Sequence, residues 1–254
     1  MVKRLFTWML IIVFMLMVFV FLGINLFIVE EDYRRPGRLG SYPHSGSYTF
    51  NPETILESLN RKESNVFTAY SGSADEIELY YDLITWSQSD YLKIAHALIQ
   101  KIWGESPDLK NWNIESLYFA QDCKDNPKGF NRFDIVYYKE LGVTNWERKY
   151  VTRFIEIQPW RGLARWGGDA IFSSSLLSRW DNIDLENFVI SADDALQIAG
   201  ENGGNETDKS ADVCSTIRVS MYQHDNKIWD VNYFAANFRI RIDPNSGKYE
   251  LLNK

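Results

Sequence analysis

The pattern of hydrophobic and polar positions divides the chain into one unbroken apolar stretch and a longer part with short apolar periods. No charged side chain occurs from Leu5 to Ile28. A helix of this length would reach about 36 Å, which exceeds the roughly 30 Å of a bilayer's hydrocarbon core. We therefore expect residues 1–29 to be a signal-anchor that crosses the cell membrane once, with the lipid bilayer as its partner.

A cleaved signal peptide is the alternative for this stretch. It fits less well, because its apolar region would span only about 7–15 residues and end at a small-residue cleavage site. Basic residues flank the stretch on both sides, so the positive-inside rule is close to undecided. The acidic residues at 30–32 favour an N-terminus inside the cell and an extracytoplasmic C-terminal domain.

Beyond the apolar stretch, the pattern predicts a tether and two folded units. Residues 30–50 are rich in glycine, proline and serine and have no apolar period, which is typical of a flexible tether. Apolar residues then recur at helical spacing at 90–104 and at 191–203, and strand-like alternation follows each helix. We expect a first helix-plus-sheet unit at 51–170, with an N-terminal helical extension, and a second unit at 171–254.

The two units repeat residue by residue. The segment Phe133–Tyr138 aligns with Trp229–Phe234, and Ile155–Gly162 aligns with Ile240–Gly247. Alternation along each strand leaves one apolar face, which an amphipathic helix can cover. The predicted fold class is α+β, with an N-terminal transmembrane helix followed by two tandem units, each a helix packed on a small antiparallel sheet.

Composition and charge narrow the function classes. The chain is 45% hydrophobic and 24% charged, which excludes a disordered polymer. Its net charge of −7 argues against a nucleic-acid partner, because an acidic body repels polyanions. A bridge between its two cysteines, Cys123 and Cys214, would suit an oxidising compartment, and two unrelated buried thiols are an equal alternative.

The sequence contains no catalytic signature, so we expect no enzyme, no cofactor and no metal. The histidines His44, His96 and His224 do not stand at metal-ligand spacing, and neither a nucleophile elbow nor a phosphate-binding loop occurs. An enzyme would need a cluster such as Asp134, Asp230 and His224 in one cleft.

Four residues in the connection between the units are the candidate binding residues, namely Trp160, Arg161, Trp166 and Trp180. Loop tryptophans and arginines are common at recognition surfaces. One interpretation is a groove for a peptide or glycan between the units. The other is that the tryptophans cover the seam between two sheets.

Three segments carry a resemblance to a known family. In order, Ser191–Ala199, Ile228–Val231 and Ile242–Gly247 are similar to the helix opening, a core strand and the closing turn of a PepSY-type domain. The resemblance is clearest over 190–254, and a weaker copy lies at 90–165. It implies protein binding, often regulation of an extracytoplasmic peptidase, and no catalytic residues.

The expected function follows from the anchor, the repeat and the resemblance. We expect a single-pass, membrane-anchored, extracytoplasmic binding or regulatory protein that contacts another envelope protein and modulates an envelope peptidase. The alternative is a sensor or solute-binding module that holds a peptide or glycan in the tryptophan-lined groove.

Overall fold

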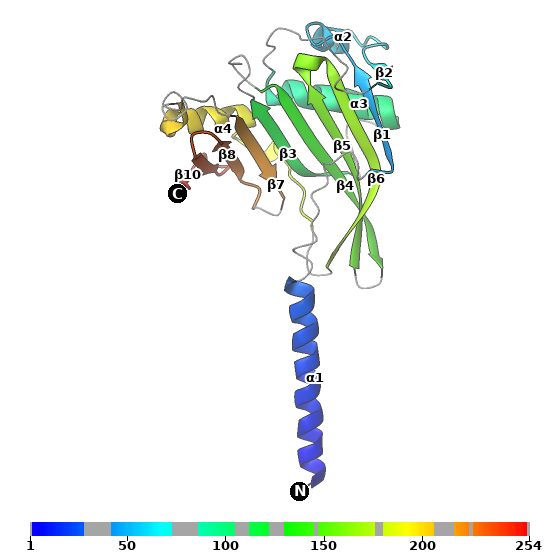
Figure 1. Cartoon of the computed structure of the whole chain (residues 1–254), viewed down its shortest axis with the longest axis vertical. Coiled ribbons are helices and arrows are strands. Elements are labelled where there is room, and N and C mark those ends of the chain that lie inside the picture. The colour runs from blue at the N-terminus through cyan, green and yellow to red at the C-terminus, as the bar shows by residue number, and fades with distance from the viewer. Residues whose placement is uncertain are drawn as a thin grey trace.

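The computed structural model consists of one N-terminal helix and a folded part built on a single sheet (Figure 1). The N-terminal helix is α1 (Val2–Phe27). The structure describes residues 2–27, 42–72, 86–104, 112–121, 130–144, 147–175, 180–205, 216–223 and 226–252.

Ten antiparallel strands form this sheet, in the order β10-β9-β8-β7-β3-β4-β5-β6-β1-β2. The strands are β1 (His44–Thr49), β2 (Thr68–Tyr70), β3 (Asn113–Gln121), β4 (Arg132–Thr144), β5 (Glu147–Gln158), β6 (Leu163–Ser175), β7 (Ile217–Tyr222), β8 (Trp229–Tyr233), β9 (Phe238–Ile242) and β10 (Tyr249–Leu251). The predicted fold class of two small sheets is therefore wrong. Strands β3 and β7, which correspond to the first predicted strand of each unit, pair with each other. The pairing satisfies backbone groups that two separate sheets would each leave unpaired at an edge.

The boundaries also differ from the predicted domains. Strand β1 begins at His44 and so lies inside the segment predicted as a tether at 30–50. The predicted boundary between residues 170 and 171 falls within β6, which runs without a break to Ser175. The chain between the two repeats is thus largely strand, where the sequence indicated an irregular connection.

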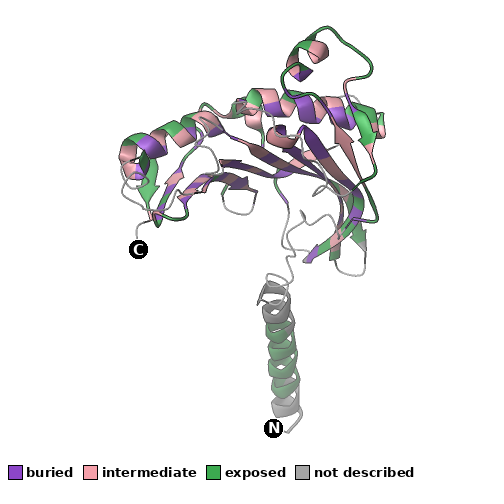
Figure 2. Cartoon of the chain, turned by 45° about the horizontal axis from the view of Figure 1, so that its top comes forward, coloured by how far each residue is buried: buried purple, intermediate pink, exposed green. Residues whose placement is uncertain are grey.

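Helices α3 and α4 lie along the same face of the sheet (Figures 1 and 2). Both begin with a capping box, in which Ser87 and Asp90, and likewise Ser191 and Asp194, satisfy each other's backbone N–H groups. Helix α3 ends at Gly104, whose φ of 66° suits glycine. The helical segments of the folded part are α2 (Ile55–Asn60), α3 (Gln88–Trp103), η3 (Pro159–Arg161), η4 (Leu185–Asn187), α4 (Ala192–Ala199) and η5 (Gly200–Gly204).

The hydrophobic core fills the space between these two helices and the sheet. Alternate residues of each central strand point into it, as the period of two predicts. The fully buried contributors include Tyr91, Ile94 and Leu98 from α3, Ala195 and Ala199 from α4, and Leu117, Phe133, Ile155, Val219, Val231 and Ile240 from the strands.

The sheet register reproduces the residue correspondence between the two halves of the sequence. Tyr118 of β3 lies opposite Ser220 of β7. Next to them, Asp134 lies opposite Tyr118, and Asp230 lies opposite Ser220. A pseudo-twofold axis normal to the sheet therefore passes between Tyr118 and Ser220, and it relates Asp134 to Asp230.

The same axis brings the N-termini of α3 and α4 together. The backbone N–H of Gln88 donates to the carboxylate of Asp193 at 2.8 Å, and the N–H of Ala192 donates to the side-chain oxygen of Gln88 at 2.7 Å. The carboxylate offsets the positive ends of two helix dipoles that would otherwise repel each other. Burial raises the pKa of Asp193 above its ordinary value.

The N-terminal helix does not meet the expectation of a membrane span. Across the described ranges, no helix combines the length and the hydropathy that crossing a membrane requires. On this finding the predicted transmembrane segment and signal-anchor at 1–29 are wrong. The orientation and extracytoplasmic location inferred from them stay predictions.

The position of β8 in the core predicts a large loss of stability when a charged side chain replaces a core-facing residue of this strand. The variant Val231→Asp should lower the free energy of unfolding by about 4 kcal/mol, because Val231 is fully buried within the apolar core. Urea denaturation followed by far-ultraviolet circular dichroism measures the loss. As a control, Asn232→Asp on the opposite face of the same strand should change stability by less than about 1 kcal/mol. Equal losses in the two variants would contradict this register.

Candidate functional site

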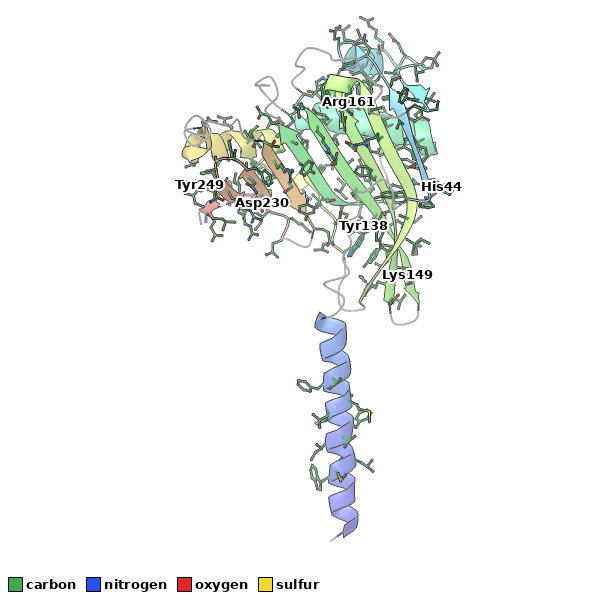
Figure 3. The ribbon with its side chains drawn as sticks, in the orientation of Figure 1. His44, Tyr138, Lys149, Arg161, Asp230 and Tyr249 are labelled. Carbon is green, nitrogen blue, oxygen red and sulfur yellow. The ribbon has the colours of Figure 1, made fainter. Side chains whose placement is uncertain are left out.

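The four predicted binding residues lie at different places in the fold. Trp160 and Arg161 form η3 at the turn between β5 and β6, with the Arg161 guanidinium carbon 4.3 Å from the Trp160 ring centroid. Figure 3 shows Arg161 at the opposite end of this hairpin from Lys149. Trp166 lies in β6 opposite Ile155, on the face that the helices cover.

Trp180 lies on the other face of the sheet. Its ring stacks on that of Tyr150 at 4.3 Å and 3° between planes, and it meets Tyr138 edge-on. Tyr138 alternates with the core residue Tyr137 along β4, so it points away from the helices. Trp166 and Trp180 are thus on opposite faces, and the structure does not bring the four residues into one groove.

Trp166 belongs to an aromatic cluster around Arg153 that the sequence did not indicate. The Arg153 guanidinium carbon lies 4.5 Å from the Trp103 centroid and 4.1 Å from the Trp112 centroid. Trp103 and Trp166 meet edge-on at 5.7 Å. A Cβ at Gly46 would come within 2.9 Å of the Trp166 indole nitrogen. The small residue lets the ring lie against β1, so this cluster packs the end of α3 onto the sheet.

We call the sheet surface opposite α3 and α4 the helix-free face. The register aligns one residue from each of eight adjacent strands into a single row across this face. From the β6 side to the β10 side, the polar row consists of Arg165, Glu156, Asp134, Tyr118, Ser220, Asp230, Arg241 and Glu250. Side chains opposite one another in antiparallel strands are direct neighbours. The row therefore places four carboxylates and two guanidinium groups in one line.

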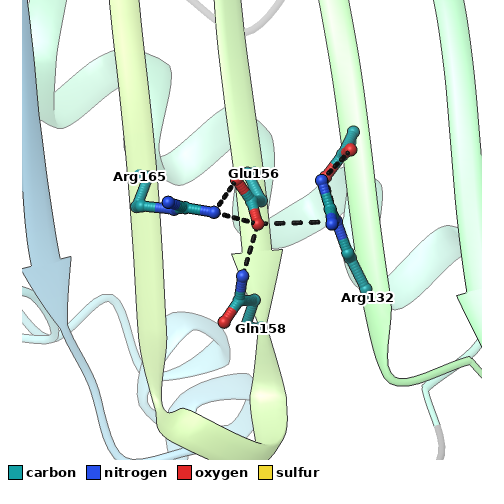
Figure 4. A network of polar contacts seen from close by, with 5 residues as sticks. Arg132, Glu156, Gln158 and Arg165 are labelled. Atoms are coloured by element: carbon teal, nitrogen blue, oxygen red, sulfur yellow. Dashed lines mark hydrogen bonds and ion pairs between the residues drawn. The ribbon is translucent and has the colours of Figure 1, made fainter. Parts of the chain in front are cut away.

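Glu156 is the most buried member of the row, with a side chain only 2% exposed. Figure 4 shows its contacts. Arg165 Nη2 lies 2.5 Å from one carboxylate oxygen and 2.6 Å from the other. Arg132 Nε lies 3.4 Å away, and the Gln158 amide donates to the same carboxylate. Two cations and an amide thus compensate one buried charge.

Arg132 joins Glu156 to the next carboxylate of the row. Its Nε donates to Asp134 Oδ1 at 3.0 Å and its Nη2 donates to Oδ2 at 2.7 Å. Burial raises the pKa of Asp134 to about 7; the bonds from Arg132 oppose this shift, and the negative charge of Glu156 adds to it. Glu156 and Asp134 therefore share the guanidinium groups of Arg132 and Arg165, and Asp134 titrates near neutral pH.

The other half of the row is more open and contains more arginine. Asp230 binds Arg239, which donates through Nε at 2.8 Å and 3.0 Å, and Arg241 Nε lies 3.8 Å from the same carboxylate. The Arg239 and Arg241 side chains are 44% and 39% exposed. Next to them, the Arg218 guanidinium carbon lies 4.1 Å from the Phe234 ring centroid. This half has the accessible charged groups.

The cluster that an enzyme would need is not formed within the described residues. Asp134 and Asp230 share the row, but Tyr118 and Ser220 separate them, and each carboxylate is bound to arginine. His224 lies outside the described residues. In the ranges that the structure describes, no group of three His, Cys, Asp or Glu side chains could hold a metal ion. Cys123 and Cys214 also lie outside these ranges, so their pairing stays a prediction.

The buried carboxylate predicts a specific loss of stability. Glu156→Gln should lower the free energy of unfolding by about 3 kcal/mol, because it leaves the guanidinium groups of Arg132 and Arg165 without their shared anion. Glu250→Gln, at the exposed end of the same row, is the matched control and should cost less than about 0.5 kcal/mol. Urea unfolding midpoints measure both, and a smaller loss for Glu156→Gln than for the control would contradict the network.

The raised pKa of Asp134 predicts a pH dependence of stability. The folded state binds this proton more tightly than the unfolded chain, whose carboxyl has the ordinary pKa of 3.8. The Asp134 carboxyl therefore lowers stability as the pH rises from about 4 to about 7. The free energy of unfolding of the wild type, minus that of Asp134→Asn, should fall over this range and then level off. A difference that grew with pH would show that the pairing with Arg132 outweighs burial.

No family model matches the chain, and no curated protein or solved structure matches it. The resemblance of residues 190–254, and more weakly of 90–165, to PepSY-type domains therefore stays a prediction. The case for a function rests on the geometry of the helix-free face.

Proposed function

We propose that the chain is a binding protein that acts without catalysis and docks a protein partner on the helix-free face of its sheet. The observation that carries the proposal is that helices α3 and α4 cover only one face of the sheet (Figure 2). These helices and the main hydrophobic core occupy that face. The polar row crosses the other face, beside two small hydrophobic clusters that include Phe154 and Tyr150. A broad face with fixed polar groups suits the recognition of a folded surface or an extended segment.

The side chains of this face are held in place before any partner arrives. Arg132 donates hydrogen bonds to both carboxylate oxygens of Asp134, and Arg239 does the same to Asp230. Fixed side chains lose little conformational entropy on binding, which favours affinity. Arginine and tyrosine, here with Tyr118 at the centre, are the residue types most enriched at binding hot spots.

Exposure along the row indicates where docking is centred. Glu156 is buried, whereas Tyr118, Ser220 and Asp230 are partly exposed and Glu250 is exposed. Arg239 and Arg241 are 44% and 39% exposed, more than Arg132 and Arg165 at 37% and 27%. The most accessible guanidinium groups that pair with the row therefore lie on the side of the axis formed by β7, β8, β9 and β10. A partner centred on Ser220 would contact the axis and the arginines of the second half.

Site-specific photo-crosslinking tests the proposal. A photoreactive amino acid at Ser220, in the full chain expressed in its own cells, should give one adduct of defined mass. The same amino acid at Gln197, on the exposed side of α4, is the matched control and should give none. The crosslinked protein, identified by mass spectrometry and purified, should bind the full chain directly, and Ser220→Trp should weaken that binding by about tenfold or more.

Three results would contradict the proposal. These are adducts of equal yield at the two positions, a folded Ser220 derivative that gives no adduct, and binding of the purified protein that Ser220→Trp leaves unchanged. Circular dichroism of each derivative checks that the fold is retained.

A further inference from the structure

Arg218 stands out among the arginines of the helix-free face because of what surrounds it. Its guanidinium carbon lies 4.1 Å from the Phe234 centroid and 5.7 Å from the Tyr118 centroid. These are cation–π contacts, which hold the group without using its N–H donors. The residue is exposed and lies on β7, the strand that also carries Ser220 of the pseudo-twofold axis pair.

The other arginines described on this face each have an acidic partner. Arg132 pairs with Asp134, Arg165 with Glu156, and both Arg239 and Arg241 with Asp230. For Arg218, no acidic side chain lies within ion-pair distance among the residues that the structure describes.

The neighbours of Arg218 in the register are uncharged as well. They are Ala120 on β3 and Asn232 on β8. Beyond them, Arg132 follows Ala120 and Arg239 follows Asn232 in the same transverse row. The row thus carries three guanidinium groups, of which the two outer ones are neutralised by Asp134 and Asp230. The central one keeps its full positive charge and its five N–H donors.

We infer that Arg218 is the anchor for a carboxylate side chain of the protein partner. The inference rests on the proposed function, because it names the chemistry by which the helix-free face recognises that partner. A guanidinium binds a carboxylate through two parallel hydrogen bonds, and prior stacking on two rings fixes its orientation. The Asn232 amide, beside Arg218 on β8, can donate a further hydrogen bond.

A carboxylate on a polypeptide fits better than an extended polyanion. The chain carries a net charge of −7, which repels nucleic acid and anionic lipid at long range. Asp230 and Glu250 lie in the neighbouring row of the same face. They would repel phosphates arranged in series, whereas a single acidic side chain meets Arg218 alone.

Fluorescence anisotropy of the full chain at low ionic strength tests the inference. The probe is a fluorescein-labelled peptide with a single glutamate among serine and glycine residues, and the same peptide with glutamine in place of the glutamate is the negative control. The acidic peptide should bind the wild type, and Arg218→Gln should weaken it by about tenfold. Arg218→Lys should give an intermediate loss, because it keeps the charge but not the planar donor pair. The matched control is Arg61→Gln, which removes an exposed arginine from beside α2 and should bind as the wild type does.

Several outcomes would overturn the inference. They are equal affinity in Arg218→Gln and the wild type, equal binding of the glutamine peptide, and a loss of the same size in Arg61→Gln. Binding of phosphatidylglycerol vesicles or inorganic phosphate that depends on Arg218, with none of the acidic peptide, would instead assign a phosphate ligand. Thermal unfolding of each variant verifies its fold.

The crosslink at Ser220 separates this inference from the proposed function. An adduct that forms in the wild type and weakens in Arg218→Gln supports both. An adduct that is unchanged in Arg218→Gln overturns the carboxylate anchor and leaves the docking face in place. Absence of the adduct from the wild type overturns the docking face itself, whatever the peptide does.

Discussion

The rest of the structure depends on the pairing of β3 with β7. These strands are the first of their repeats, and each would be an open edge if its repeat folded alone. Their antiparallel register, with Tyr118 opposite Ser220, joins two half-sheets into one and sets a pseudo-twofold axis normal to it. Because every other strand pairs outward from this junction, a shift of one residue here would break the alignment of all the rows that cross it.

The direction of the axis explains why the molecule has a helix-free face. A twofold axis normal to a sheet exchanges the two halves but keeps each face on its own side. Helices α3 and α4 must therefore cover the same face, and their N-termini meet at the axis, where Gln88 and Asp193 join them. A twofold axis in the plane of the sheet would have put one helix on each face, so neither face would be free of helices.

The sequence predicts features that lie within one helix or strand. It does not predict features that depend on which strands lie side by side in the sheet. The helix ends, the alternation and the alignment of 133–138 with 229–234 follow from local patterns, and the register agrees with that alignment. Local patterns do not determine which strand edges pair with each other. The alternation of apolar and polar residues shows which face of a strand is buried, but it does not identify the strand that lies beside it. The burial of Glu156 was missed for the same reason: its position reads as solvent-facing until Arg165 and Arg132 are brought beside it by adjacent strands.

Charge is where the two symmetric halves diverge. The axis relates Glu156 to Arg241 and Arg165 to Glu250, so equivalent positions carry opposite charges. In the first half Glu156 and Arg165 join Arg132 and Asp134 in one network, in which each carboxylate contacts at least one guanidinium group. In the second half Arg239 and Arg241 share Asp230, and Arg218 has no acidic partner among the described residues. The first half thus pairs its charged groups with one another, and the uncompensated charge of the second half is the reason to look for the partner there.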